Sequence, residues 1–122
     1  MRIMVVDDSR QIRRHVSRTL LESGHDCVEA EHGQACLDLL QNESVDIILL
    51  DWNMPVMDGL ETLKLLKAES KWSQIKVIMM TTENKDEKIQ LALDCGANEY
   101  IMKPLTKEVL LEKLLLANDD LF

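Results

Sequence analysis

Short apolar runs that alternate with stretches of helical spacing constrain the fold of this 122-residue chain. Three of the runs are almost continuously apolar and rich in Val, Ile and Leu, which is typical of parallel strands buried on both faces. The predicted strands are residues 2–6, 26–30, 46–50, 77–80 and 99–102. The predicted helices are residues 9–22, 33–41, 60–69, 85–95 and 106–117. Five successive β-α units with right-handed crossovers predict an α/β protein, in which helices cover both faces of a doubly wound parallel sheet.

Turn-forming and capping residues fall between these elements. Gly24 and Gly96 follow predicted helices, at positions where glycine commonly ends a helix. Asp58 and Thr106 precede predicted helices, and we expect them to be N-caps. A chain of this length fits one hydrophobic core, so we predict a single domain over residues 1–122. We also expect a stand-alone protein rather than one domain of a longer chain.

Composition and charge exclude several classes of function. The formal net charge of -8 argues against direct binding of nucleic acid, because phosphate backbones are held by clustered Lys and Arg. No run approaches the roughly 18 apolar residues that a membrane-spanning helix needs, so we predict no contact with a membrane. Cys27, Cys36 and Cys95 are odd in number and fit no C-x-x-C spacing. We therefore expect buried thiols rather than disulfides or a zinc site, and a cytoplasmic protein.

Polar residues directly follow four of the predicted strands. Asp7 and Asp8 follow the first strand, Asp51 the third, Thr81 the fourth and Lys103 the fifth. Ligands of open α/β sheets bind beyond the carboxyl ends of the strands, so we expect these five side chains to meet at one edge. A single Asp at a strand end is usually a cap or a turn residue, but this combination in this order indicates a functional site.

The residue types at this edge suit metal-assisted phosphoryl chemistry. Three clustered carboxylates repel one another, and a divalent cation bound among them relieves the repulsion. Mg²⁺ is the predicted ion, because it prefers hard oxygen ligands and often binds through carboxylates together with phosphate oxygens. A carboxylate can also attack phosphorus. Lys103 would supply positive charge, and Thr81 a hydrogen bond to a phosphoryl oxygen. Pro104 makes the Lys103–Pro104 bond a candidate for the cis form.

Five segments together resemble one known family over nearly the whole chain. They include the Met-Val-Val-Asp-Asp end of the first strand and the Asp-Trp-Asn-Met-Pro stretch that begins at Asp51. The segments are residues 4–8, 49–55, 57–59, 80–83 and 96–104. In combination they resemble the receiver domain of two-component response regulators, and most of all the stand-alone, chemotaxis-type (CheY-like) regulators. The resemblance implies a flavodoxin-like, CheY-like fold with five helices and the strand order 2-1-3-4-5.

The resemblance also implies roles for the site residues. Asp51 would be the phosphoacceptor, and a sensor histidine kinase would be the phosphodonor. Asp7, Asp8 and Asp51, together with the backbone carbonyl of Asn53, would bind Mg²⁺, with Mn²⁺ as an alternative ion. Lys103 would contact the phosphoryl group.

Further residues match family positions that transmit or end the signal. Thr81 and Tyr100 match the switch hydroxyl and the switch aromatic residue. Asn53 and Glu83 match positions that modulate dephosphorylation. By the same resemblance, phosphorylation would remodel the face formed by residues 85–117, which would bind a downstream protein target or a second copy of the chain.

The last predicted helix carries more apolar residues than one face requires. Leu110, Leu114 and Ala117 form a stripe that would face the core. The flanking apolar residues are Leu111, Leu115 and Leu116. Two interpretations stay open, namely a wide stripe packed on the sheet and a contact surface for a partner.

Two other classes of function compete with the receiver domain. A haloacid dehalogenase-like phosphatase also uses an Asp nucleophile at a strand end, but it needs an acid two residues later, where this chain has Asn53. A phosphate-independent interaction module would keep only the fold, and the intact acidic residues, Thr81 and Lys103 count against it. We therefore predict a signalling phosphoacceptor and not an enzyme that turns over a separate substrate.

Overall fold

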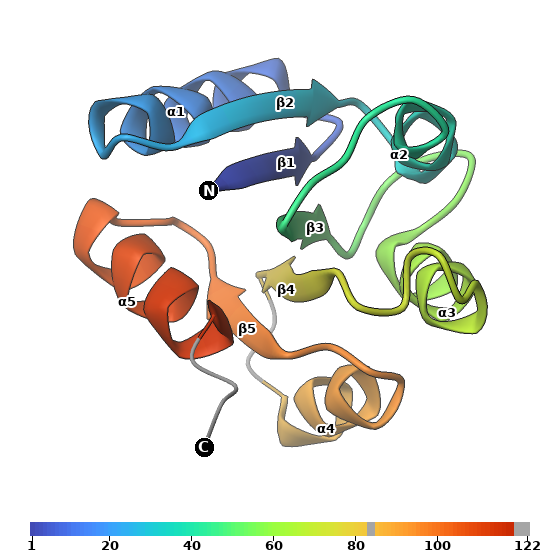
Figure 1. Ribbon diagram of the computed structural model, residues 1–122. Helices are drawn as coiled ribbons and strands as arrows, with labels where there is room; N and C mark the ends of the chain where they lie inside the picture. The colour runs from blue at the N-terminus through green and yellow to red at the C-terminus, as the bar shows by residue number, and fades with distance from the viewer. Residues whose placement is uncertain (83–84, 119–122) are drawn as a thin grey trace.

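Five parallel strands form one sheet in the computed structural model, which describes residues 1–82 and 85–118 (Figure 1). The strands are β1 (Arg2–Val6), β2 (Asp26–Ala30), β3 (Ile47–Asp51), β4 (Lys76–Thr81) and β5 (Glu99–Met102). Their spatial order is β2-β1-β3-β4-β5, which confirms the order implied by the family resemblance. Each predicted strand agrees with an observed strand to within one residue at both ends.

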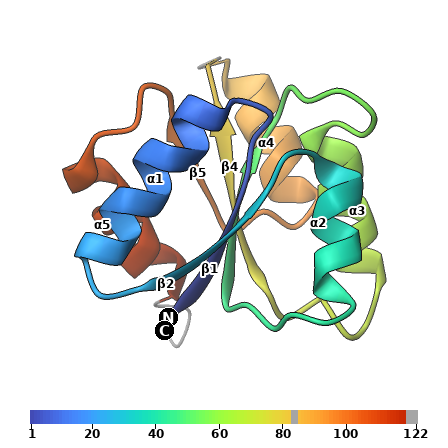
Figure 2. The ribbon, with the colours of Figure 1, turned by 90° about the horizontal axis from the view of Figure 1, so that it is seen from above.

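Helices cover both faces of the sheet. They are α1 (Arg10–Glu22), α2 (Gly33–Leu40), α3 (Gly59–Ala68), α4 (Asp86–Asp94) and α5 (Lys107–Asn118). Figure 2 shows α1 and α5 on one side of the strands and α2, α3 and α4 on the other. The predicted α/β class and doubly wound arrangement are therefore confirmed. Within the described residues, no helix has the length and apolar character needed to cross a bilayer.

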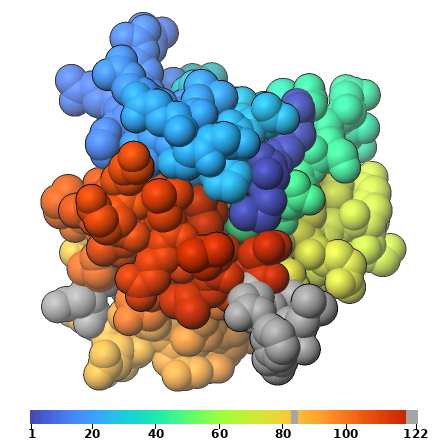
Figure 3. Space-filling model, turned by 60° about the vertical axis from the view of Figure 1, so that its left-hand side comes forward, coloured from blue at the N-terminus to red at the C-terminus, as the bar shows by residue number. Residues whose placement is uncertain are grey.

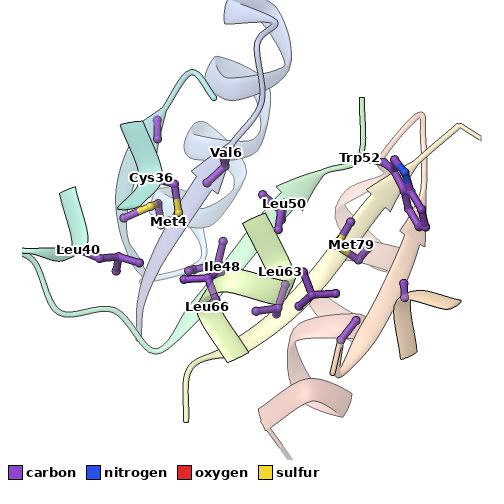
Figure 4. Packing of buried hydrophobic residues seen from close by; sticks show 14 residues of the cluster. Met4, Val6, Cys36, Leu40, Ile48, Leu50, Trp52, Leu63, Leu66 and Met79 are labelled. Carbon is purple, nitrogen blue, oxygen red and sulfur yellow. The ribbon is translucent and has the colours of Figure 1, made fainter. Parts of the chain in front are cut away.

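The sheet separates two hydrophobic cores, because successive side chains of a strand point to opposite faces. In β1, Ile3 and Val5 pack in the core beneath α1 and α5, whereas Met4 and Val6 pack in the core beneath α2 and α3. All four side chains are fully buried. Figure 4 shows the second core, in which Leu63 of α3 lies against the sheet. Both faces of the central strands are therefore dry, as their continuous apolar character predicts.

The helix ends follow the predicted capping residues. A side-chain oxygen of Asp58 accepts a hydrogen bond of 2.8 Å from a backbone N–H in the first turn of α3. Thr106 Oγ1 accepts one of 3.2 Å at the start of α5. After α1 and α4, Gly24 and Gly96 adopt φ angles of 88° and 109°, a conformation that glycine reaches at little cost. Both pairs of predictions are confirmed.

The exposure of the leucines in α5 decides between the two interpretations of its apolar residues. Leu110 and Leu114 are buried against the sheet, and Leu111 packs at the margin of the same core. Leu115 and Leu116 are 70% and 51% exposed, so the interpretation of one wide packed stripe is wrong for these two residues. Figure 3 shows α5 in red beside the blue N-terminal segments. The exposed leucines add apolar area to the surface of α5.

The three cysteines are free thiols, as predicted. Cys36 is fully buried in the core beneath α2 and α3, as predicted, whereas the prediction of burial is wrong for Cys27 and Cys95, which are half-buried. Burial raises the pKa of the Cys36 thiol to about 12. Because the thiolate is the reactive form, the Cys36 side chain acts as a small apolar residue.

The start of α3 approaches the end of β3 so closely that only glycine fits between them. The N–H of Gly59 donates a hydrogen bond of 2.8 Å to the carbonyl of Trp52. A Cβ atom at position 59 would lie 2.2 Å from the carbonyl oxygen of Asp51 and 2.8 Å from the Cα of Trp52. Both neighbours are backbone atoms, which cannot move aside as a flexible side chain can. This contact ties α3 to the strand that ends in Asp51.

The substitution Gly59→Ala tests this contact. At an ordinary helix position Ala is the better helix former, by up to about 1 kcal/mol, and the change would stabilise the protein. Here we expect a loss of about 1–3 kcal/mol in the free energy of unfolding, because the added methyl group overlaps backbone atoms. Urea denaturation followed by circular dichroism measures the difference. A variant as stable as the wild type, or more stable, would contradict the close approach.

Candidate functional site

The predicted site residues meet at one edge of the sheet. Asp51 is the last residue of β3 and pairs in register with Met80, and Thr81 ends β4 and pairs with Met102. The backbone N–H of Lys103 donates a hydrogen bond of 2.8 Å to the Thr81 carbonyl, which continues the pairing of β4 with β5 by one residue. The ends of neighbouring parallel strands thus bring together residues that lie far apart in the chain.

Lys103 connects two of the carboxylates directly. Its Nζ atom lies 2.8 Å from Asp7 Oδ2 and 2.9 Å from Asp51 Oδ1. Asp7 is fully buried and Asp51 is 4% exposed, so the shared ammonium group compensates two charges that have lost most of their water. The peptide bond between Lys103 and Pro104 is cis, as predicted.

The third carboxylate completes an acidic pocket that is open to solvent. Carboxylate oxygens of Asp7, Asp8 and Asp51 all lie within 4.8 Å of one another, and Asp8 is exposed. Hard oxygen donors at this spacing suit a divalent cation such as Mg²⁺, which commonly keeps several waters and uses few protein ligands. With a single ammonium group among them, the three carboxylates carry a net negative charge that favours such an ion. The predicted acidic cluster is therefore present.

The turn from β1 to α1 holds Asp7 in place. Its Oδ1 atom accepts a hydrogen bond of 2.8 Å from the backbone N–H of Ser9. Ser9 is the N-cap of α1, and its Oγ atom accepts a hydrogen bond of 3.3 Å from the N–H of Ile12. The N–H of Asp7 donates to the carbonyl of Ala30 in β2 at 3.1 Å. The position of this carboxylate is thus coupled to the start of the first helix.

Burial and neighbouring charges shift the pKa values of Asp51 and Lys103. Burial raises the pKa of Asp51, and the nearby carboxylates of Asp7 and Asp8 raise it further, although the hydrogen bond from Lys103 opposes both effects. Burial alone would lower the pKa of Lys103, but its hydrogen bonds to Asp7 and Asp51 raise it above its ordinary value of 10.5. Lys103 therefore stays charged at neutral pH.

The loop between β3 and α3 contains a strained turn beside the pocket. The N–H of Met57 donates a hydrogen bond of 2.7 Å to the carbonyl of Pro55, which closes a three-residue turn. The central residue, Val56, has a φ of 71° and is 79% exposed. This conformation is unfavourable for a β-branched residue. Asn53, at the start of this loop and two residues after Asp51, is exposed.

Thr81 and Tyr100, the two predicted switch residues, lie on neighbouring strands. Thr81 is 6% exposed at the end of β4, and Tyr100 is half-buried on β5 with Lys113 Nζ 4.5 Å from the centroid of its ring. Tyr100 pairs in register with Met79, two residues before Thr81. Because residues two apart on a strand share a face, Tyr100 and Thr81 lie diagonally on the face covered by α4. The predicted role for Glu83 falls outside the described residues.

Sequence reasoning missed the contact of Arg13 with the site. The guanidinium group of Arg13 donates a hydrogen bond of 2.7 Å from Nη1 to the carbonyl oxygen of Asp7. The helical pattern gave no sign of this contact, since Arg13 follows the apolar residue Ile12 as an ordinary polar residue would. Trp52, the residue after Asp51, is 8% exposed and belongs to the core beneath α2 and α3.

Comparisons with known proteins agree with this architecture. Residues 3–115 match the sequence model of the response regulator receiver domain. The chain is 49% identical over 116 residues to the chemotaxis protein CheY homolog of Campylobacter jejuni (strain 81-176), an alignment that covers 93% of this chain and 89% of that protein. It is 42% identical to CheY1 of Helicobacter pylori (strain 26695), over 93% of this chain and 94% of the relative. The structure of CheY4 from Vibrio cholerae superposes with a TM-score of 0.89 at 37% identity, over 93% of this chain and 95% of the other.

The chain therefore belongs to the response regulator receiver domain family. Within that family it is a CheY-like receiver of the chemotaxis type, a signalling phosphoacceptor and not a catalytic enzyme, which excludes the phosphatase alternative. The pocket of Asp7, Asp8 and Asp51 is typical of the receiver's Mg²⁺ site. Membership implies a histidine kinase as phosphodonor and downstream targets for the signal.

The shifted pKa of Asp51 predicts how pH acts on the substitution Asp51→Asn. Because the folded-state pKa lies above the ordinary value of 3.8, ionisation of Asp51 costs folding free energy. At a pH well below 3.8, Asp51 is protonated in both the folded and the unfolded state, and this cost is absent. The cost reaches its full size once the pH exceeds the folded-state pKa. We therefore expect the variant to be more stable than the wild type near pH 7, with the difference shrinking as the pH falls through this window. Urea denaturation at a series of pH values measures it.

Asp26→Asn is the matched control for this experiment, because Asp26 is exposed at the start of β2, away from the carboxyl edge of the strands. It should change stability little at any pH. A decrease in stability of Asp51→Asn near pH 7 would show that the ion pair with Lys103 outweighs burial and like-charge repulsion, and would contradict the prediction.

Proposed function

We propose that Asp51 accepts a phosphoryl group from a sensor histidine kinase in a reaction that depends on Mg²⁺. One observation carries this proposal: Lys103 Nζ already contacts the Asp51 carboxylate at 2.9 Å and Asp7 at 2.8 Å, beside the open carboxylate of Asp8. A buried nucleophile with a cation at hydrogen-bonding distance and an adjacent acidic pocket is the arrangement that phosphoryl transfer requires. Catalysis here consists mainly of positioning and charge neutralisation.

In the proposed transfer, a carboxylate oxygen of Asp51 attacks the phosphorus of phosphohistidine. The new O–P bond forms while the P–N bond breaks, and the imidazole leaves with the bonding electron pair. The second nitrogen of the phosphorylated ring carries a proton when the P–N bond breaks, so the products are an aspartyl phosphate and a neutral histidine. Lys103 remains protonated throughout and balances the negative charge of the transferred group. A small acyl phosphate would serve as donor by the same attack.

The pocket provides ligands for the metal ion. Asp7, Asp8 and Asp51 would hold Mg²⁺ or Mn²⁺ together with the backbone carbonyl of Asn53, and the bound ion would neutralise the phosphoryl oxygens. The contacts of Asp7 with Ser9 and Lys103 hold its carboxylate in position before any ligand arrives. Such preorganisation lowers the cost of binding.

A switch would run from Thr81 to Tyr100 along the face of the sheet beneath α4. Thr81 lies at the carboxyl end of β4, and its hydroxyl would donate a hydrogen bond to a phosphoryl oxygen on Asp51. Tyr100 lies diagonally from Thr81 on the same face and is half-buried, so an inward rotation would bury more of its ring. We infer that phosphorylation biases an equilibrium between two positions of these side chains.

The signal would leave through the surface of α4, β5 and α5, within residues 85–117. This surface carries exposed apolar side chains, which mark candidate interaction sites on a soluble domain. They are Leu91 (43% exposed), Leu93 (37%), Val109 (39%), Leu115 (70%) and Leu116 (51%). A downstream protein target or a second copy of the chain would bind there.

We further propose that residues 1–122 act as one receiver domain in a cytoplasmic, chemotaxis-type pathway. The relatives support this, since the matched region covers 89% of the C. jejuni protein and 94% of the H. pylori protein. Three free cysteines agree with a reducing compartment. Water would reset the system by hydrolysing the acyl phosphate, at a rate that Asn53 and Glu83 modulate.

Acetyl phosphate labelling tests the proposed chemistry. With Mg²⁺ present, intact-mass spectrometry should detect one added phosphoryl group on the wild type, and hydroxylamine should remove it because it is an acyl phosphate. Asp51→Asn should abolish the label, and a chelator should reduce it strongly. Asp26→Asn, which leaves the pocket intact, should label like the wild type. Undiminished labelling of Asp51→Asn would overturn the assignment of the phosphoacceptor.

The single tyrosine of the chain allows a direct test of the switch. With 3-fluorotyrosine incorporated, one ¹⁹F resonance should report Tyr100, and acetyl phosphate with Mg²⁺ should shift it in the wild type. In Thr81→Ala the label should still form on Asp51, but the resonance should move much less, because no hydroxyl links the phosphate to the aromatic ring. An equal shift in both proteins would show that Thr81 does not transmit the signal.

A further inference from the structure

Arg13 joins the metal pocket to the second strand through one side chain. Its Nη1 atom donates to the Asp7 carbonyl at 2.7 Å, and its Nε atom lies 3.3 Å from Glu29 Oε1 in β2. The Arg13 side chain is only 14% exposed, whereas that of Glu29 is 42% exposed. Figure 2 shows α1 lying along β1 and β2, the arrangement that lets one guanidinium group reach both acceptors.

The carbonyl that Arg13 contacts belongs to the peptide unit between Asp7 and Asp8. The other polar atoms of Asp7 are bound by backbone groups and by Lys103, and Arg13 donates to the carbonyl oxygen of this peptide. Asp8 is exposed, and the direction of its side chain depends on the orientation of this peptide. A carbonyl without its donor could rotate and carry the Asp8 carboxylate out of the 4.8 Å cluster.

We propose that Arg13 is a positioning residue for the divalent-cation pocket, acting through the Asp7–Asp8 peptide. This inference rests on the proposed Mg²⁺ site. Arginine suits the role because its planar guanidinium group presents several donors in a fixed fork, and can bind a carbonyl and a carboxylate at once. Outer contacts of this kind commonly change metal affinity by about 10–100-fold.

The charge of Arg13 and its positioning contact predict opposite changes in Mg²⁺ affinity when Arg13 is removed, so a binding measurement distinguishes the two roles. Arg13 is a cation near the pocket, so its removal should tighten Mg²⁺ binding if it acts only through its charge. Removal of a positioning contact should weaken binding. Arg14 is the matched control, because it is the next residue of α1, carries the same charge and is exposed.

In the experiment, each protein is titrated with Mg²⁺ alone and the heat of binding is measured by isothermal titration calorimetry. Thermal unfolding without metal measures the stability of each protein separately. We expect Arg13→Gln to raise the Kd for Mg²⁺ about tenfold. Arg14→Gln should leave the Kd unchanged or slightly lower. Arg13→Lys keeps the charge but cannot engage both acceptors with fixed geometry, and it should give an intermediate Kd. If Arg13→Gln does not fold, Arg13→Lys and Arg14→Lys carry the same comparison.

The outcomes separate this inference from the function on which it rests. Wild type that binds Mg²⁺, with Arg13→Gln binding as tightly as Arg14→Gln or more tightly, would overturn the role of Arg13 and leave the proposed site intact. Wild type that does not bind Mg²⁺ would overturn the proposed site and this inference together. Weaker binding by Arg13→Gln only, with Arg14→Gln unaffected, supports the positioning role.

Discussion

Charge balance at the carboxyl edge of the sheet is the constraint on which the site depends. Three carboxylates lie within 4.8 Å of one another, two of them are buried, and Lys103 is shared between those two. Like charges so close together oppose folding, and the packed cores on both faces of the sheet must hold them in place. The pocket is therefore a region where stability is given up for binding, and a bound dication would restore the charge balance.

Much of the fold follows from local periodicity, because the strands are buried on both faces and the helices on one. A continuous apolar run and a helical stripe are different signals, and each element was located to within one residue. The spatial order of the strands, in contrast, does not follow from local periodicity. Alternation of strand and helix is compatible with several windings, and the order came from the family resemblance, since pairing between distant strands leaves no periodic trace in the sequence.

The site was predictable to the extent that it lies at strand ends. Asp7, Asp51 and Lys103 were placed at one edge because the ends of parallel strands converge there. The double contact of Lys103 and the link from Arg13 to the Asp7 carbonyl depend on side-chain geometry in three dimensions, which residue types alone do not specify. The exposure of Leu115 was also undetermined, because a helix with apolar residues on several sides has no single inward face.

The ion pairs of Lys103 join parts of the chain that are very far apart. Its partners Asp7 and Asp51 lie 96 and 52 residues away in sequence. Contacts of such separation close long loops, and the entropy lost in closing them must be offset before the contacts stabilise the fold. Lys103 follows β5, so its ammonium group reaches Asp7 and Asp51 only when β5 is paired with β4. The charge balance of the pocket is thus a property of the completed sheet, because it needs side chains from both ends of the chain.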